Sequence, residues 1–225
     1  MNGMYDILKE LPLFRGIDEK QLGELISKTK FHFLKYLTGE TVLNAGEPCT
    51  HIKFIISGAA RFTVSNYNER VKVSQTLEAP NVIAPEFLFG KDPYYPASGF
   101  ALETTGILQI AKQDYVRILN SGAVFLYNYL NTVSTEAQKG VDGILAVTSG
   151  SLDQRIAFWI IALTQSGATD ITLTCKQRDL YSLFGVQRSS FIATLEGMKE
   201  KGLIDYNPTE INVTSRAGLM EMLNL

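Results

Sequence analysis

Two short helical patterns separated by a glycine are the feature of this sequence that most limits its fold. Apolar residues recur at helical spacing on one side of each pattern: Leu180, Leu183 and Phe184 in the first, and Phe191, Leu195 and Met198 in the second. Gly185 lies between them, at a turn that needs a residue able to adopt a positive φ. Residues 176–204 are therefore predicted to form a helix-turn-helix.

A helix-turn-helix can place its second helix in the major groove of DNA, where the first residues of that helix face the base edges. Arg188 is suited to the paired acceptors of guanine or to a phosphate, and Ile192 to a thymine methyl group. The candidate DNA-contacting residues, for bases or phosphates, are Lys176, Arg178, Gln187, Arg188, Ser189, Ser190, Ile192 and Ala193. The alternative is an interaction module in which the same fold serves dimerisation or scaffolding and binds protein instead of DNA.

The charge balance allows only a local attraction to nucleic acid. The 225-residue chain has a formal net charge of −2 and a pI near 5.8, and residues 151–225 carry seven Lys or Arg against eight Asp or Glu, a net −1. Between positions 175 and 190, however, Lys176, Arg178 and Arg188 outnumber Asp179. This local positive patch favours DNA, whereas the net −1 favours the protein-binding alternative.

Cysteine usage and hydropathy predict a cytoplasmic protein with no membrane segment. Cys49 and Cys175 are the only cysteines and lie in different predicted domains, so a disulfide framework is not expected. The longest apolar run, 157–163, is far shorter than a membrane span, and the N-terminus lacks the pattern of a secretion signal.

The first thirty residues are predicted to be helical, with Asp18 and Gln21 as a capping box and Leu22, Leu25 and Ile26 as an apolar stripe. The sequence pattern then changes to short runs of β-forming residues, which are separated by turn-forming residues. These runs lie at 40–43, 51–56, 61–64, 71–76 and 106–110. Close-spaced strands of this kind predict a small barrel or sandwich.

Helical character resumes near Gln113 and develops a regular apolar stripe. Apolar or small residues alternate at spacings of four and three: Leu126, Leu130, Val133, Ala137, Gly140, Ile144 and Val147. A mean period of about 3.5 is typical of a two-stranded coiled coil, so these residues form the predicted dimer seam. The alternative is that the stripe packs on its own domain. Gly140 and Gly143 weaken this helix and are candidates for a hinge.

Residues 148–151 interrupt the helical pattern and mark a domain boundary. Beyond them the sequence predicts a helix at 152–164, a strand at 171–173, the helix-turn-helix, and a last helix from Ser215. Runs at 203–206 and 210–213 flank Asn207-Pro208-Thr209 and predict the hairpin wing of a winged helix. The predicted domains are a sensor domain over 1–112, a dimerisation helix and linker over 113–148, and a winged helix-turn-helix over 149–225.

Motifs in both halves of the chain follow an order found in one protein family. They are Gly39-Glu40, Gly46-Glu47-Pro48, Phe54-Ile55-Ile56-Ser57-Gly58 with Arg61, and, in the helix-turn-helix, Gly185, Arg188, Leu195 and Gly202-Leu203-Ile204. Over nearly the full chain this pattern resembles the Crp/Fnr family of bacterial transcription regulators. The resemblance implies an α+β fold: a cyclic-nucleotide-binding-like β-roll (a double-stranded β-helix) with flanking helices, a long dimerisation helix and a C-terminal winged helix. It also implies a homodimer on a palindromic operator in double-stranded DNA, with RNA polymerase as a partner of an activator.

The resemblance fails at the usual effector site. Relatives that bind cyclic AMP carry a Gly-Glu pair and, about ten residues later, an Arg-Ser pair whose arginine binds the cyclic phosphate. Here Glu86 matches the carboxylate, but Tyr95 or Pro96 replaces the arginine, and no Arg occurs between Arg70 and Arg117. A buried phosphate would lack its cation, so the expected effector is an unknown small molecule and not cyclic AMP or cyclic GMP. The candidate effector pocket comprises Glu86, Phe87, Phe89, Tyr94, Tyr95, Ala97 and Ser98; the alternative is that these aromatics are simply core.

The predicted recognition helix also departs from the family pattern. Well-studied relatives read bases through an Arg-Glu-x-x-x-Arg pattern, and the corresponding residues here are Arg188, Ser189 and Ala193. Only the first retains the family's side chain. The resemblance therefore implies an operator unlike the usual one.

Other site chemistries find little support in the sequence. Two cysteines cannot supply the four ligands of an iron-sulfur cluster, and the nearby haem-ligand candidates are His32, His51 and Cys49. Neither cysteine shows a resolving partner for redox sensing. Metal-dependent enzymes built on similar β-rolls need clustered His and carboxylate ligands, which two histidines do not provide. No nucleophile elbow or phosphate-binding glycine loop occurs either, so neither catalysis nor a resident metal or cofactor is expected.

Overall fold

The computed structural model describes residues 4–146 and 150–223 and divides into two compact units. The N-terminal unit comprises Met1–Phe62 and Leu77–Glu136, and the C-terminal unit comprises Thr63–Thr76 and Ala137–Leu225. Residues 63–76 therefore belong to the C-terminal unit, although they lie within the range 1–112 predicted for the sensor domain. The functional domain boundaries remain a prediction.

Three short helical elements open the N-terminal unit: α1 (Met4–Glu10), the 3-10 helix η1 (Pro12–Phe14) and α2 (Glu19–Lys28). The predicted capping box fixes the start of α2, because the Asp18 carboxylate accepts from the Gln21 amide at 2.8 Å. Leu22 and Leu25 lie on the buried side of α2, as the apolar stripe predicts.

One sheet of this unit has the strand order β1-β8-β3-β6, with every neighbouring pair antiparallel. Its strands are β1 (His32–Tyr36), β8 (Thr105–Ala111), β3 (His51–Ser57) and β6 (Asn81–Ile83). Phe54 and Ile55 of β3 are buried, as are Ile107 and Leu108 of β8, which pair with them. These two central strands therefore form much of the core.

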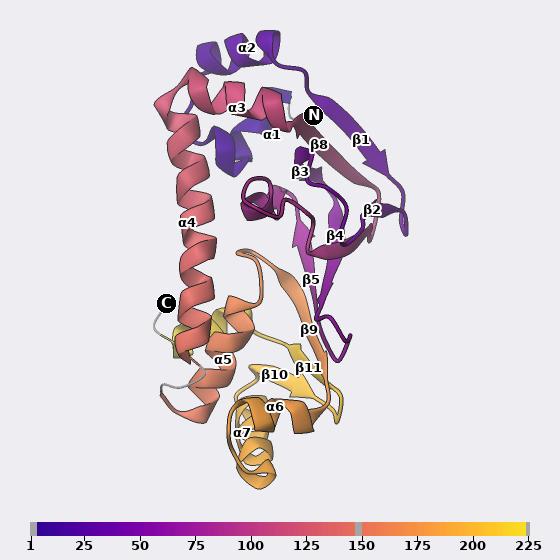
Figure 1. Cartoon of the computed structure of the whole chain (residues 1–225), viewed down its shortest axis with the longest axis vertical. Helices are drawn as coiled ribbons and strands as arrows, with labels where there is room; N and C mark the ends of the chain where they lie inside the picture. The colour runs from indigo at the N-terminus through magenta and orange to yellow at the C-terminus, as the bar shows by residue number, and fades with distance from the viewer. Residues whose placement is uncertain (1–3, 147–149, 224–225) are drawn as a thin grey trace. The chain divides into compact units, whose positions relative to one another are not determined.

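The facing strands of the unit are β2 (Thr41–Leu43), β7 (Ala97–Ala101) and β4 (Ala59–Ser65), in the order β4-β7-β2. Close packing explains Gly99, because a Cβ at this position would overlap the ring of Phe62. The two layers form the predicted sandwich (Figure 1). Three of the unit's strands, β1, β6 and β7, were not among the runs expected from sequence.

Two helices follow the sheets, α3 (Lys112–Ser121) and α4 (Ala123–Ala146), separated at Gly122. One side of α4 packs on the N-terminal unit. Phe125 is buried, and the Asn128 amide donates to the carbonyl oxygens of Leu13 at 3.0 Å and Arg15 at 2.9 Å. The first turns of α4 are therefore held by both apolar packing and hydrogen bonds.

The C-terminal unit combines an antiparallel sheet with helices. Its strand order is β10-β11-β9-β5, from β10 (Ile204–Tyr206), β11 (Glu210–Val213), β9 (Thr169–Cys175) and the part of β5 (Val71–Glu78) that belongs to this unit. Ser151 caps α5 (Leu152–Ala162), and Ser215 caps α8 (Arg216–Met222) by accepting from the Gly218 amide at 3.0 Å. The predicted wing and last helix are thus present, and the predicted α+β class is confirmed.

Within the described ranges 4–146 and 150–223, none of the helices combines the length and the apolar character that crossing a membrane requires.

Candidate nucleic-acid interface and sensor pocket

The helix-turn-helix consists of α6 (Gln177–Leu183) and α7 (Arg188–Glu200). Gly185 has a φ of +65°, and its amide donates to the carbonyl of Ser182 while the next amide, of Val186, donates to Tyr181. These two bonds are the Schellman arrangement that ends a helix, and they require a residue that tolerates the left-handed conformation. The predicted role of Gly185 is confirmed.

A second Schellman arrangement ends α7. The Gly202 amide donates to Lys199 at 2.8 Å, the Leu203 amide donates to Met198 at 3.0 Å, and Gly202 has a φ of +69°. Backbone geometry therefore fixes the turn before α7 and also its last residue.

The inner face of α7 is held by apolar packing. Phe191, Leu195 and Met198 are buried at the spacing the sequence predicts. The ring of Phe191 stacks on Phe184 with centroids 6.3 Å apart, and Phe184 meets Trp159 edge to face at 5.7 Å. This packing orients the helix and leaves its other face to solvent.

The candidate DNA-contacting residues gather on and beside that outer face. Gln187 is the N-cap of α7 and Arg188 its first residue, while Lys176 precedes α6 and Arg178 lies in its first turn. Of the eight candidates only Ile192 is half-buried; the exposed ones are Lys176, Arg178, Gln187, Arg188, Ser189, Ser190 and Ala193. Their contact with DNA remains a prediction.

Electrostatic pairing distinguishes these cations from others in the unit. Lys199 and Lys201 form ion pairs with Asp205 at 2.8 Å and Asp153 at 3.6 Å. Within the described ranges Lys176, Arg178 and Arg188 have no carboxylate partner. They are therefore available to an external anion.

The wing is tied to α6 by polar contacts. The Gln177 side-chain amide donates to the carbonyl of Asn207 at 3.1 Å, and Asn207 donates to Glu210 at 3.1 Å. The Thr209 amide donates in turn to the Asn207 side chain at 2.9 Å. Sequence reasoning found the wing but not Gln177, whose role depends on a residue thirty positions away.

The candidate effector-pocket residues differ in exposure. Glu86, Tyr94 and Ser98 are exposed, whereas Tyr95 and Ala97 are buried. Tyr95 donates to the carbonyl of His51 at 2.9 Å, and Ser98 accepts from the Ala45 amide at 3.0 Å. Phe87 and Phe89 are half-buried at and just after the 3-10 helix η2 (Pro85–Phe87). An effector role for these residues therefore stays a prediction.

Aromatic side chains fill the space beside η2. Phe89 meets Tyr129 edge to face at 5.7 Å, Tyr129 meets Tyr115 at 5.5 Å, and Lys112 lies 4.8 Å from the centre of the Phe89 ring. Only about 10 Å³ is open to a water-sized probe among Pro85, Tyr115 and Tyr129, room for about one water molecule and far too little for a nucleotide. Tyr115 and Tyr129 were missed from sequence because they come from helices distant along the chain.

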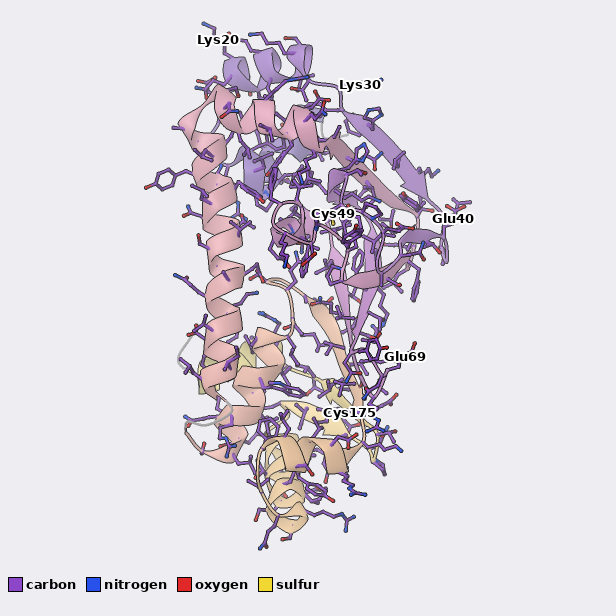
Figure 2. All side chains as sticks on the ribbon, in the orientation of Figure 1. Lys20, Lys30, Glu40, Cys49, Glu69 and Cys175 are labelled. Atoms are coloured by element: carbon purple, nitrogen blue, oxygen red, sulfur yellow. The ribbon has the colours of Figure 1, made fainter. Side chains whose placement is uncertain are left out.

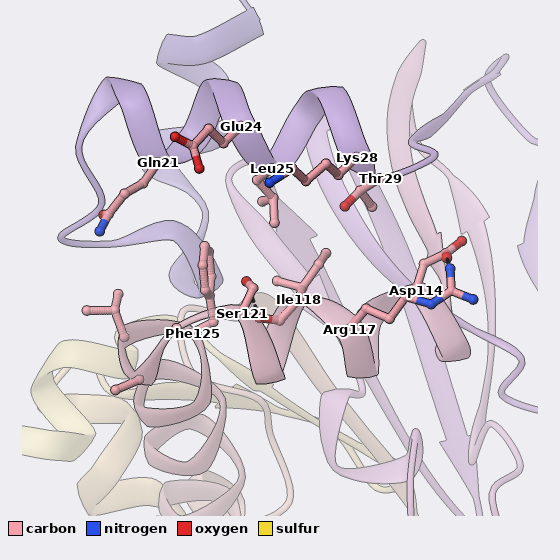
Figure 3. A pocket seen from close by; sticks show the side chains of 13 residues that line it. Gln21, Glu24, Leu25, Lys28, Thr29, Asp114, Arg117, Ile118, Ser121 and Phe125 are labelled. Carbon is pink, nitrogen blue, oxygen red and sulfur yellow. Dashed lines mark hydrogen bonds and ion pairs between the residues drawn. The ribbon is translucent and has the colours of Figure 1, made fainter.

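Larger hollows lie elsewhere. A groove of about 470 Å³ separates α2 from α3 and the start of α4, with Leu25, Ile118 and Phe125 lying between the helices (Figure 3). In the C-terminal unit an open cleft of about 610 Å³ is lined by Glu69, Arg70 and residues of the helix-turn-helix. Neither hollow was expected from sequence.

Both thiols are buried, and burial raises the pKa of each, to about 11 for Cys49. A raised pKa suppresses the reactive thiolate, so the thiols lack the electronic character of a redox sensor. No group of three or more His, Cys, Asp or Glu suited to a metal ion occurs in the part of the chain that the structure describes.

The predicted dimer seam runs along the outer side of α4. Leu126, Leu130 and Ile144 are 44%, 48% and 75% exposed. Val133 is half-buried, Ala137 and Gly140 are exposed, and Val147 lies outside the described residues. The dimer seam and its alternative, packing of this stripe on the chain's own domain, both remain predictions.

Comparison with known proteins gives two matches to family models. A cyclic nucleotide-binding domain matches residues 33–122, and a Crp-like helix-turn-helix domain matches residues 154–222. No curated protein matches the chain significantly.

Solved structures share the fold. The catabolite activator protein of Thermus thermophilus is 20% identical, with 94% of this chain and 97% of that chain covered and a TM-score of 0.52. A transcriptional regulator of the Crp/Fnr family from Eubacterium rectale is 19% identical, with 96% and 100% covered and a TM-score of 0.50. The sensor domain of the regulator DNR from Pseudomonas aeruginosa is 21% identical, with 65% and 93% covered and a TM-score of 0.51.

The two domain models match in the order cyclic nucleotide-binding domain, then Crp-like helix-turn-helix domain, and the solved structures share the fold. The chain therefore belongs to the Crp/Fnr family of DNA-binding transcription regulators, which are not enzymes.

Proposed function

We propose that the protein acts as a homodimer that reads a palindromic operator in double-stranded DNA with α7. The observation that carries the proposal is the exposed start of α7, where Arg188, Ser189 and Ala193 face outward while Phe191 and Leu195 anchor the helix from behind. A helix held in this way can enter a major groove with its first turn toward the bases. Two copies would present these helices about 34 Å apart, one turn of DNA.

The two sides of α4 support the homodimer. Phe125, Asn128 and Tyr129 face the N-terminal unit, whereas Leu130 and Ile144 of the predicted seam are exposed. A second copy of the same helix, packed along this stripe, would remove those side chains from water.

The effector in this proposal is a small molecule other than a cyclic nucleotide. The space beside η2 holds Phe89, Tyr115 and Tyr129, and the stretch 71–116 contains no arginine to pair with a cyclic phosphate. The regulator would work in the cytoplasm, with RNA polymerase as its partner if it activates transcription.

Selection from random double-stranded DNA tests the function. We expect an enriched inverted repeat with half-sites one helical turn apart. Arg188→Ala should relax the preference at one position of each half-site, by roughly 5- to 150-fold, which corresponds to about 1–3 kcal/mol for a bidentate base contact. Lys20→Ala removes an exposed cation of the N-terminal unit and should leave the preference unchanged.

Absence of any enriched sequence would contradict the proposal. Enrichment that Arg188→Ala leaves unchanged would contradict the role of Arg188 alone. Binding of a protein partner without DNA affinity would identify the interaction module that the net −1 of residues 151–225 favours.

A further inference from the structure

The hairpin between β4 and β5 is part of the C-terminal unit and ends beside the helix-turn-helix. Val71 pairs with Cys175, and the antiparallel register continues through Lys72 opposite Thr174 and Val73 opposite Leu173. One step beyond the last pair, this register brings Arg70 opposite Lys176.

The turn of the hairpin is well defined. The Asn66 amide donates to the carbonyl of Val71 at 3.1 Å, and the Glu69 amide donates back to Asn66 at 2.9 Å. The Asn66 side chain accepts a further bond from the Val71 amide at 3.1 Å. These bonds hold the tip, so the position of Arg70 follows from backbone structure.

The cleft of about 610 Å³ opens at this junction, between Arg70 of the hairpin, Lys176 and Arg178 of the helix-turn-helix and Thr209 of the wing. Two of its lining residues, Glu69 and Cys175, are labelled in Figure 2. Sequence elements that are far apart along the chain therefore contribute to one exposed surface.

The charges around the cleft favour an anion. Within the described part of the chain, the side chains of Arg70, Lys176 and Arg178 have no carboxylate partner. Glu69 is paired with Lys72 at 3.1 Å, which leaves Asp179 as the one other carboxylate in the described lining. Two cations opposite each other at the end of a β-ladder repel one another unless an anion lies between them.

We propose that Arg70 extends the DNA interface by binding a backbone phosphate together with Lys176 and Arg178. The inference rests on the proposed function, because Lys176 and Arg178 are themselves candidate DNA contacts. The guanidinium can bind a phosphate through two parallel N–H donors, and the Thr209 hydroxyl can supply another. Because no base edge is involved, Arg70 contributes affinity without sequence preference.

The test measures affinity for a duplex that carries the selected operator, in the full-length protein, over about 50–200 mM salt. Arg70→Ala should reduce the slope of log affinity against log salt by about 0.9 for each protomer bound, and weaken binding roughly eightfold per lost contact at 0.1 M salt. Arg70→Lys keeps the positive charge and should retain most of the salt slope. The control variant Lys20→Ala should retain all of it; Lys20 is labelled in Figure 2. Arg70 is exposed at a turn, so the melting temperature of each variant should equal that of the wild type.

Two results would overturn the inference while leaving the proposed function intact. One is an unchanged salt slope in Arg70→Ala when the wild type binds its operator. The other combines two observations: inorganic phosphate stabilises the wild type but not Arg70→Ala, and the two proteins show the same salt slope for DNA binding. This result would mean that the cleft binds a free anion and not a DNA phosphate. A wild type that selects no DNA would overturn both the function and the inference.

Discussion

The phenol of Tyr129 donates a hydrogen bond to the carbonyl oxygen of Pro85 at 3.2 Å and so joins α4 to η2. Burial raises the pKa of Tyr129 to about 12, so the phenol keeps its proton at neutral pH. Its ring lies between Phe89 and Tyr115 in the same region. The segment that carries Glu86, the residue matching the effector carboxylate of relatives, is therefore held against aromatic side chains.

From this packing we expect cyclic AMP to leave the thermal stability unchanged. A ligand at a hundred times its dissociation constant adds about 2.7 kcal/mol, which raises the melting temperature by several degrees. Thermal shift assays at millimolar cyclic AMP, with cyclic GMP and AMP as matched ligands, measure this. A saturable rise with a cyclic nucleotide but not with AMP would show that the aromatic side chains move aside.

Leu130→Glu should convert a dimer into a monomer. Leu130 is 48% exposed on the outer side of α4, so each dimer would lose the burial of two half-exposed leucines, about 1.5–3 kcal/mol in all. The dimer dissociation constant should rise by at least roughly tenfold, as measured by sedimentation equilibrium. Asn131→Glu adds the same charge one position away, off the seam, and should preserve the dimer. Equal behaviour of the two variants would rule out the α4 seam.

Two glycine-to-alanine substitutions should change stability in opposite directions. Gly185 has a φ of +65°, so Gly185→Ala should lower the free energy of unfolding by about 1–2 kcal/mol. Gly140 lies within α4, and a Cβ there meets no atom within 4 Å, so Gly140→Ala should raise it by up to about 1 kcal/mol. Urea unfolding measures both. A loss of stability in Gly140→Ala would mean that the helix bends at this residue or that the second copy of α4 packs closely against it.

Stability should decline as the pH falls below about 6.5 because of His51. Burial is the main reason that the pKa of His51 is lowered, with smaller contributions from the charges of His32 and Lys53. The unfolded state then binds a proton more readily than the folded state, so stability is lost between the unfolded pKa, about 6.5, and the lower folded pKa.

His51→Gln should remove this part of the pH dependence, which urea midpoints at pH 7.5 and 5.5 measure. His32→Gln should keep most of it, because burial, the largest cause, is unchanged. Parallel pH profiles for the wild type and His51→Gln would contradict the prediction.

The helix-turn-helix could be predicted from sequence because its signals are local. Gly185, the apolar positions of α7 and the wing turn around Pro208 all lie within a short segment. The structure confirms two of these signals directly: Gly185 has a positive φ, and Phe191 and Leu195 form the buried face of α7.

The missed strands and contacts depend on tertiary structure. In β7, Gly99 and Ser98 weaken the strand pattern, and the glycine is explained only by its contact with Phe62. Likewise, the pairing of Val71 with Cys175 joins residues that are far apart in sequence, and no short-range pattern specifies such a register.

The two Schellman turns around α7 have a consequence for how specificity can evolve. Gly185 and Gly202 fix the turn before the helix and its end through the backbone, and the buried side chains fix its orientation. Positions 188, 189 and 193 contribute to neither, so their side chains can be exchanged at little cost to folding. If α7 reads the operator as proposed, a few substitutions at these positions would give a descendant of this protein a different target sequence while its architecture stays the same.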